Sequence, residues 1–214
     1  LLSDWIKEIK YELGQYKEDN PEAKVAPFAV NQICHLSNDR LFKDVETCVK
    51  HEAPIIITSL RPPEDLVKAI HSYGGLVFHD VINTRHARKA VEQGVDGLIL
   101  VCAGAGGHAG ALSPFALLRE TREWYEGTVL LSGAISDGFS VASSLAMGAD
   151  LAYVGTRFIA TKESEADDDY KKMLIESAAK DVVYTNYFSG VHGNYLGPSI
   201  SRSGMDPQDL PEAD

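Results

Sequence analysis

A single histidine stands within a glycine-rich segment, residues 104–110, where its imidazole can exchange a proton with a bound ligand. Glycine has no Cβ, so this backbone can approach a ligand closely and direct its N–H groups at an anion. An imidazole titrates at about pH 6.5, so His108 can take a proton from a carbon acid or donate a hydrogen bond to an anion. We therefore treat His108 as the candidate catalytic residue. The alternative is a histidine that only packs or hydrogen-bonds within a turn.

Two later segments end apolar runs with small residues and are typical of phosphate-binding turns. Residues 132–135 read Ser-Gly-Ala-Ile, and Gly155 and Thr156 follow the next apolar run. Each precedes a helix start, where unpaired N–H groups and the helix dipole favour a phosphate. In a (β/α)8 barrel such a site lies after strands seven and eight, so residues 104–110 would follow strand six. The pattern predicts a flavin or nucleotide site with a histidine beside it.

Other ligand classes fit these residues less well. The glycines of residues 104–110 are spaced unlike the GxGxxG fingerprint of dinucleotide-binding folds, and no Walker A lysine follows the loops. The histidines show no metal-ligand spacing. The three cysteines form no CxxC pair; they are Cys34, Cys48 and Cys102. We therefore expect reduced cysteines, no disulfide and no metal site.

Composition narrows the function further. The 214 residues carry a formal net charge of −11, with 44% hydrophobic and 24% charged residues. An acidic chain lacks the basic footprint of a nucleic-acid-binding protein and is not attracted to anionic membrane surfaces. No apolar run approaches the roughly 18 residues of a membrane span. We expect a cytoplasmic, single-domain protein with no nucleic-acid or membrane partner.

Short apolar runs alternate with segments of helical periodicity, which predicts an α/β fold with a parallel sheet. The expected strands are residues 25–31, 54–59, 75–82, 95–101, 128–134 and 151–155. The expected helices are residues 4–15, 64–73, 85–93, 115–126 and 138–147. Ser113 with Pro114, and Asp137, mark two helix starts, and the tail from Gly197 is expected to be loop. An open doubly wound sheet and a (β/α)8 barrel both fit, and both bind ligands at the carboxyl ends of their strands.

Several motifs together resemble one family. They read Ala-Gly-Gly-His-x-Gly at 105–110, Ser-Gly-Ala-Ile-x-Asp-Gly at 132–138, Ala-Met-Gly-Ala-Asp at 146–150, Gly-Thr-Arg-Phe at 155–158 and Pro-Phe-Ala-Val-Asn at 27–31. From residue 27 onward the chain resembles the nitronate monooxygenases, formerly called 2-nitropropane dioxygenases. The FMN-dependent enoyl-acyl-carrier-protein reductases of bacteria share most of these motifs.

The resemblance implies a TIM barrel that binds FMN noncovalently at its C-terminal face. His108 matches the family histidine near the reactive face of the flavin. The residues expected to bind the cofactor are Asn31, at the flavin; Val101, Gly106 and Gly107, along it; Gly133, Ala134, Gly155 and Thr156, at the phosphate; and Tyr153 and Val154, next to these. The family often has glutamine at the position of Val101 and an acid at that of Gly104. These two departures remove polar contacts and leave the substrate open.

The resemblance also implies that part of the barrel lies outside this chain. A complete barrel has eight strands and about 250 residues, whereas the sequence predicts six strands, starting at the family's third. We expect residues 1–214 to be one FMN-binding barrel domain that lacks its first two strands and is incomplete at both ends. Either the native protein is longer or another chain supplies the missing layer, which leaves a homo-oligomer open.

The implied activity is the oxidation of a nitronate or nitroalkane by dioxygen to a carbonyl compound and nitrite. The alternatives are an FMN-dependent NAD(P)H reductase of an enoyl thioester or a quinone, and an inactive flavin-binding remnant. Four further residues are weighed for the site. His79 either lines the barrel mouth or is a core histidine, His192 either borders the substrate or serves the loop, and Thr58 and Ser59 are candidate flavin-side hydroxyls.

Overall fold

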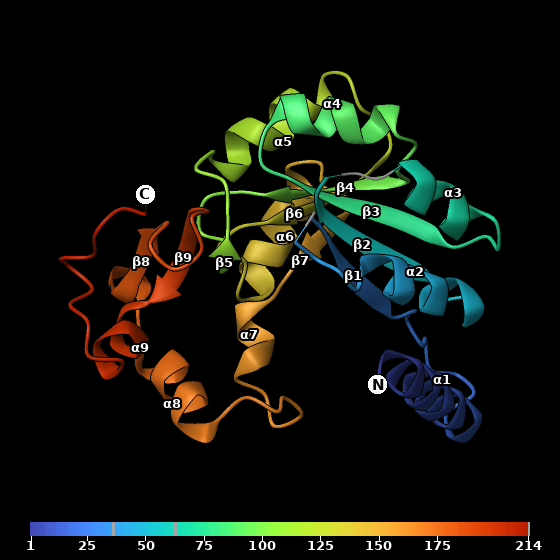
Figure 1. The fold of residues 1–214 in the computed structure, drawn as a ribbon, viewed down its shortest axis with the longest axis horizontal. Helices are drawn as coiled ribbons and strands as arrows, with labels where there is room; N and C mark the ends of the chain where they lie inside the picture. Colours follow the sequence, from blue (N-terminus) through green and yellow to red (C-terminus); the bar gives the residue numbers. More distant parts are fainter. Residues whose placement is uncertain (36, 62–63, 214) are drawn as a thin grey trace. The chain divides into compact units, whose positions relative to one another are not determined.

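The computed structural model describes residues 1–35, 37–61 and 64–213. The chain divides into two compact units. Unit 1 comprises Leu1–Val81 and Arg85–Leu98, and unit 2 comprises Ile82–Thr84 and Ile99–Asp214. Figure 1 shows the elements of both, and each unit is considered by itself.

Unit 1 is built on three parallel strands, β1 (Ala29–Cys34), β2 (Ile55–Leu60) and β3 (Leu76–Val81). They lie in the order β1-β2-β3, with Ala29 paired to Ile55 and Ile55 to Leu76. The helices of this unit are α1 (Leu2–Asp19), α2 (Leu41–Lys50), α3 (Glu64–His71) and, apart from its first residue, α4 (Thr84–Glu92).

Helix α3 shows why these segments pack as they do. Leu66, Val67 and Ile70 fall on one helical face and are buried. The solvent face carries a Glu64–Lys68 ion pair of 2.6 Å at i,i+4 spacing. Burial of the apolar face holds the helix, because an ion pair between two exposed side chains contributes little to stability.

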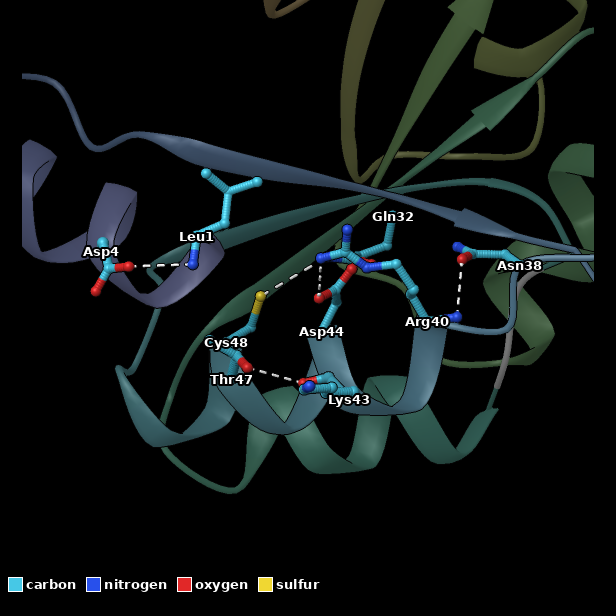
Figure 2. A network of polar contacts seen from close by, with 9 residues as sticks. All are labelled: Leu1, Asp4, Gln32, Asn38, Arg40, Lys43, Asp44, Thr47 and Cys48. Carbon is cyan, nitrogen blue, oxygen red and sulfur yellow. Dashed lines mark hydrogen bonds and ion pairs between the residues drawn. The ribbon is translucent and has the colours of Figure 1, made fainter.

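Helix α2 was not among the expected helices, yet it fixes which side of β1 is covered. Gln32 of β1 is buried and its amide nitrogen lies 3.8 Å from the Cys48 sulfur on α2. Figure 2 shows this contact together with the Arg40–Asp44 ion pair along the helix. The sheet face that carries Gln32 is therefore the one that packs against α2.

Unit 2 contains the end of β4 (Gly97–Val101), which begins in unit 1, followed by β6 (Thr128–Ser132) and β7 (Leu151–Tyr153). These strands are neighbours in the order β4-β6-β7, and Leu130 pairs in parallel with Leu151. The helices are α5 (Pro114–Arg122), α6 (Gly138–Ala146), α7 (Thr156–Ile159) and α8 (Asp168–Glu176). The expected alternation of strands and helices, and with it the α/β class, is confirmed.

A second, antiparallel sheet of unit 2 was not predicted. It consists of β5 (Gly107–His108), β9 (Gly193–Leu196) and β8 (Val182–Thr185), in the order β5-β9-β8. The three strands stand together in Figure 1 near α9 (Gly197–Arg202). The expectation of loop from Gly197 onward is wrong for α9, because Pro198 sits in its first turn and Ile200 is buried, but it holds for residues 203–213, which form no helix or strand.

Strand and helix ends differ from the expected ones in instructive ways. The first strand was expected at residues 25–31 but runs Ala29–Cys34, since Gln32, Ile33 and Cys34 continue the pairing with β2. The start of α6 is as expected: Asp137 Oδ1 accepts a 2.8 Å hydrogen bond from the Ser140 N–H. Local chemistry thus predicted helix starts well, whereas strand limits depend on a partner strand.

Candidate functional site

Three loops that follow strands of unit 2 contact one another, as expected for the phosphate-binding turns. The Ala134 N–H donates a 3.0 Å hydrogen bond to the Gly104 carbonyl. A Cβ on Gly104 would lie 2.9 Å from the Ala134 Cβ, and a Cβ on Gly106 would lie 2.5 Å from Thr156 Oγ1. Such distances exclude larger side chains, so glycine is required where these loops meet.

The turn after β6 has an unusual backbone. Gly133 has φ +140°, and a Cβ there would approach the Ala103 carbonyl oxygen to 2.8 Å. Ala134 has φ +54°, in the left-handed region that L-residues other than glycine, asparagine and aspartate seldom adopt. Strain of this kind costs on the order of 1 kcal/mol and is concentrated at ligand sites. The turn between β6 and α6 thus holds Ala134, the non-glycine residue with a positive φ among the described residues of unit 2.

The remaining cofactor candidates of unit 2 surround these turns. Val101 ends β4, and its carbonyl accepts a 3.1 Å hydrogen bond from the Gly110 N–H, which closes the loop carrying His108. Tyr153 ends β7, Val154 follows it, and Gly155 with Thr156 leads into α7. Apart from Asn31, which belongs to unit 1, the residues named from sequence for this role thus lie at strand ends, in the loops that follow them, in β5 (Gly107) or at the start of α7 (Thr156).

His108 lies in β5 rather than in a free turn, opposite Gly193 of β9. Its Nε2 is 2.7 Å from Ser189 Oγ, and the Ser189 hydroxyl donates to the Val191 carbonyl at 3.1 Å. A serine hydroxyl has one proton, so when Ser189 donates it to Val191, Nε2 is the donor toward Ser189. In that arrangement the proton of neutral His108 is on Nε2, and Nδ1 is the nitrogen able to accept one.

Further hydrogen bonds fix the backbone around His108. The Asn194 amide donates to the Ala105 carbonyl at 2.7 Å, and the Tyr184 hydroxyl donates to the Ala109 carbonyl at 3.2 Å. His192 stacks on Tyr184 with ring centroids 5.1 Å apart. His192 pairs with Tyr184 in the support of the loop, so its loop role is the one the structure favours.

Asn31, the candidate of unit 1, lies in the middle of β1 and is exposed. It pairs with Ile57, which pairs with Phe78, whereas its neighbour Gln32 faces α2. Because side chains alternate along a strand, Asn31 lies on the face opposite α2. That is the side of β1 on which a ligand can reach an amide.

Of the two interpretations of His79, the structure favours the core histidine. Gln32 pairs with Thr58 and Thr58 with His79, so His79 shares the face that packs against α2. The imidazole is 2% exposed, and its Nδ1 is 2.7 Å from Thr58 Oγ1. Burial lowers the pKa of His79 to about 4, so it is a neutral core histidine. Thr58 is buried on the same face, which removes it as a flavin-side hydroxyl.

Asp80 is the residue of this region that sequence reasoning passed over. It follows His79 and so lies on the opposite face of β3, the face of Phe78 and Asn31. Among the described residues its Oδ1 atom is buried with no hydrogen-bond partner. Burial alone raises the pKa of this carboxyl to about 7. An acid at the carboxyl end of an apolar strand was the available signal.

Two cavities lie away from these residues. One of about 400 Å³ opens at the amino ends of β2 and β3, lined by residues such as Pro54 and Leu76, and one of about 430 Å³ lies beside Gly197. Ligands of α/β folds bind at the opposite, carboxyl ends of strands. Over the described residues, no three metal-ligating side chains converge, and no helix has both the length and the apolar character needed to cross a membrane.

Known proteins with similar sequences indicate the family to which this chain belongs. A nitronate monooxygenase from Paraburkholderia phytofirmans is 30% identical over 156 residues, covering 69% of this chain and 43% of the relative. An octahydro-1H-indene-4-carboxyl-CoA dehydrogenase from Rhodococcus jostii is 24% identical over 159 residues, covering 74% of this chain and 45% of the relative. The chain thus spans less than half the length of these curated relatives.

Solved structures agree on the fold. FabK from Thermotoga maritima matches with a TM-score of 0.75 and 26% identity over 92% of this chain and 60% of its own. A nitroalkane oxidase from Streptomyces ansochromogenes matches with a TM-score of 0.72 and 22% identity over 86% of this chain and 65% of its own. Both are TIM barrels, so the barrel class of the fold is confirmed. The nitronate monooxygenase family model matches residues 9–199, and the chain belongs to that family.

Proposed function

We propose that the protein is an FMN-dependent oxidoreductase that converts alkyl nitronates or nitroalkanes and dioxygen into carbonyl compounds and nitrite. The observation that carries the proposal is the geometry of His108. Its Nε2 is engaged by Ser189, its Nδ1 can accept a proton, and Gly106, two residues before it, contacts the Thr156 turn. A base is thus attached to a loop that is shaped for a cofactor.

The residues present fit FMN. Backbone N–H groups of Gly133, Gly155 and Thr156 would hold the phosphate, with Ala134, Tyr153 and Val154 beside them. The Ala134 N–H itself donates to the Gly104 carbonyl and so fixes the turn. Val101, Gly106 and Gly107 would lie along the ring system, and Asn31 would contact it. Gly107 and Gly155 support this fit, because nothing lies within 4 Å of the place where a Cβ would be, which leaves their backbone open to a ligand. FMN, when bound, supplies the redox chemistry.

His108 has a defined part in the reaction. With a nitroalkane, Nδ1 takes the proton from the carbon that bears the nitro group, which leaves the nitronate anion beside an imidazolium. With a nitronate as substrate, the protonated ring donates a hydrogen bond to the anion. Two nitronates and one dioxygen balance two carbonyl compounds and two nitrites, so no further reductant is needed. Ser189 holds the ring in the tautomer that this role requires.

A second function is favoured by the match to FabK and by the CoA-thioester dehydrogenase relative. It is the reduction of an enoyl thioester or a quinone by NAD(P)H through the same cofactor. A third reading is an inactive flavin-binding remnant. We also propose that these residues form one incomplete barrel domain of a cytoplasmic protein, with a homo-oligomer or a longer chain completing the barrel.

Flavin bleaching without oxygen separates these functions. We expect a nitronate, and not NAD(P)H, to reduce the flavin of the purified protein, and oxygen consumption to follow. With a nitroalkane as substrate, which needs a base, His108→Ala should lower the rate of oxygen consumption about 100-fold or more while the flavin absorbance stays. His35→Ala, an exposed histidine of unit 1, is the matched control and should leave the rate unchanged. Bleaching by NAD(P)H would support the reductase, and purified protein without flavin would support the remnant.

Ser189→Ala tests the tautomer. The imidazole remains, but its Nε2 loses the acceptor that fixes the proton. We expect kcat with a nitroalkane to fall about tenfold and kcat with a preformed nitronate to change less, since only the nitroalkane needs a base. Equal losses on both substrates would assign Ser189 to packing alone.

A further inference from the structure

The small antiparallel sheet of unit 2 has two distinct faces. His108 pairs with Gly193 and Gly193 with Thr185, so the three lie on one face. Tyr195, two residues beyond Gly193, lies on that same face, diagonally next to His108. Gly193 has no side chain and is buried against the Gly107 backbone, whereas His108 is exposed. The imidazole is therefore accessible to a ligand beside Ser189.

Aromatic rings extend from Tyr195 along this face. Phe188 contacts Tyr195 with ring centroids 4.8 Å apart, and Tyr187 contacts Phe188 at 5.2 Å. Phe188 is 40% exposed and Tyr187 is 38% exposed. We call these three residues the aromatic cluster. Ser189, the partner of the His108 imidazole, directly follows Phe188, so the cluster is tied to His108 by β9 and by this hydrogen bond.

The cluster lies in a segment without ionic side chains. Residues 182–201 contain no Asp, Glu, Lys or Arg, although charged residues make up 24% of the chain. A surface for a phosphate or carboxylate-bearing tail would need cations, which this segment does not supply. Partly exposed aromatic rings instead gain free energy by covering apolar or planar groups. The chemistry of the segment therefore favours an uncharged, apolar ligand group.

We propose that the aromatic cluster is the specificity site for the substrate of His108, and that it takes an aryl or other bulky apolar group attached to the reacting carbon. This inference rests on the proposed function and names its substrate class. The nitronate end lies at His108, and the apolar group covers Tyr195 and Phe188. Small nitronates such as ethylnitronate leave the cluster uncovered and are poorer substrates.

Steady-state kinetics with two nitronates test the proposal on the purified holoprotein. The probes are the anion of phenylnitromethane and ethylnitronate. We expect wild-type kcat/KM to be at least about tenfold higher for the phenyl compound. Phe188→Leu keeps the apolar volume but removes the ring, and should cut this preference roughly five- to tenfold by lowering only the phenyl value. Phe139→Leu, an 86% exposed phenylalanine on α6, is the control and should change neither value.

A binding measurement separates this proposal from the proposed function. Benzoate resembles phenylnitronate in shape and charge but does not react. We expect benzoate to bind at least about fivefold more tightly than propionate in wild type, and Phe188→Leu to abolish the difference. If nitronates are not oxidised but benzoate still binds more tightly than propionate, the proposed oxidation is rejected and the aromatic cluster is still supported as a binding site for apolar groups. If ethylnitronate is the better substrate, or benzoate and propionate bind equally, the cluster proposal is overturned; another part of the protein then covers these rings.

Discussion

In each unit, an aspartate just before a strand accepts hydrogen bonds from a neighbouring strand and from one side chain, but the donating side chain differs. In unit 1, Asp96 precedes β4, and its Oδ2 accepts hydrogen bonds from the Val77 N–H at 2.7 Å and from His71 Nε2 at 2.8 Å. In unit 2, Asp150 precedes β7, and its Oδ2 accepts from the Val129 N–H at 2.8 Å and from Arg122 at 2.6 Å. In both, a carboxylate joins the starts of two neighbouring strands.

The cation makes the difference. An imidazole is charged only when protonated, whereas a guanidinium is always charged and offers five donors. Arg122 uses this capacity, because it also donates to the carbonyls of Tyr125, Gly127 and Gly148. Unit 2, which carries the loops around His108, is therefore braced at the amino ends of its strands more firmly than unit 1. Rigid strands hold the loops at their carboxyl ends in register.

The carboxyls of the two units also respond to pH in opposite directions. Burial opposes ionisation of Asp150, but the Val129 N–H and Arg122 outweigh it and hold the pKa below its ordinary value. Asp80 of unit 1 has no such partners for its buried oxygen among the described residues, and burial raises its pKa to about 7. The Asp150 carboxylate of unit 2 therefore has hydrogen-bond partners, whereas the buried Oδ1 of Asp80 in unit 1 has none among the described residues.

The largest expected effect comes from Asp80. Between its ordinary pKa of 3.8 and about 7, the folded protein binds a proton that the unfolded chain has lost, so stability falls as pH rises through this window. The full fall is at most about 4 kcal/mol, at 1.36 kcal/mol per pKa unit. Asp80→Asn should remove this fall. Urea unfolding at pH 5 and pH 8 measures it, and the same pH dependence in both proteins would contradict an unsatisfied Asp80.

The side that Asp80 occupies illustrates where sequence reasoning stopped. Residues 76–81 are apolar on both sides of His79 and Asp80, so the sequence alone does not show which of the two faces α2. Only the register from Gln32 through Thr58 to His79 settles it. Side chains alternate strictly along a strand, so this register places His79 on the face of α2 and Asp80 on the opposite face.

Elements with local signals were predicted, and those that depend on distant pairing were not. Asp137 and Pro114 correctly predicted the starts of α6 and α5, because a helix cap depends only on residues within one turn of it. The meeting of Gly106 with Thr156 followed from parallel strands ending at one edge. In contrast, β5 is two residues long and exists through its pairing with β9, some 85 residues later in the chain. No periodicity can reveal such a strand.

The second-largest effect is expected from the Asp150–Arg122 contacts at the amino ends of the unit 2 strands. Asp150→Ala leaves the Val129 N–H and Arg122 without their acceptor. The site is half exposed, so water replaces part of what is lost, and we expect the free energy of unfolding to fall by about 2 kcal/mol. Glu126→Ala is the control, because Glu126 is an exposed acid in the loop between α5 and β6. This substitution should lower the free energy of unfolding by less than about 0.5 kcal/mol. Loss of stability should be accompanied by weaker flavin retention if the brace holds the loops.

The smallest effect is expected from the counterpart in unit 1. Asp96→Ala removes the acceptor of the Val77 N–H and of His71, and the expected loss is about 1 kcal/mol because no fixed charge is left without a partner. The decisive measurement is the difference between the two variants in urea unfolding at one pH. Asp150→Ala should cost about 1 kcal/mol more than Asp96→Ala, because it leaves a permanently charged guanidinium without its acceptor. Equal costs would show that the two side-chain donors are equivalent, and the comparison between the units would fail.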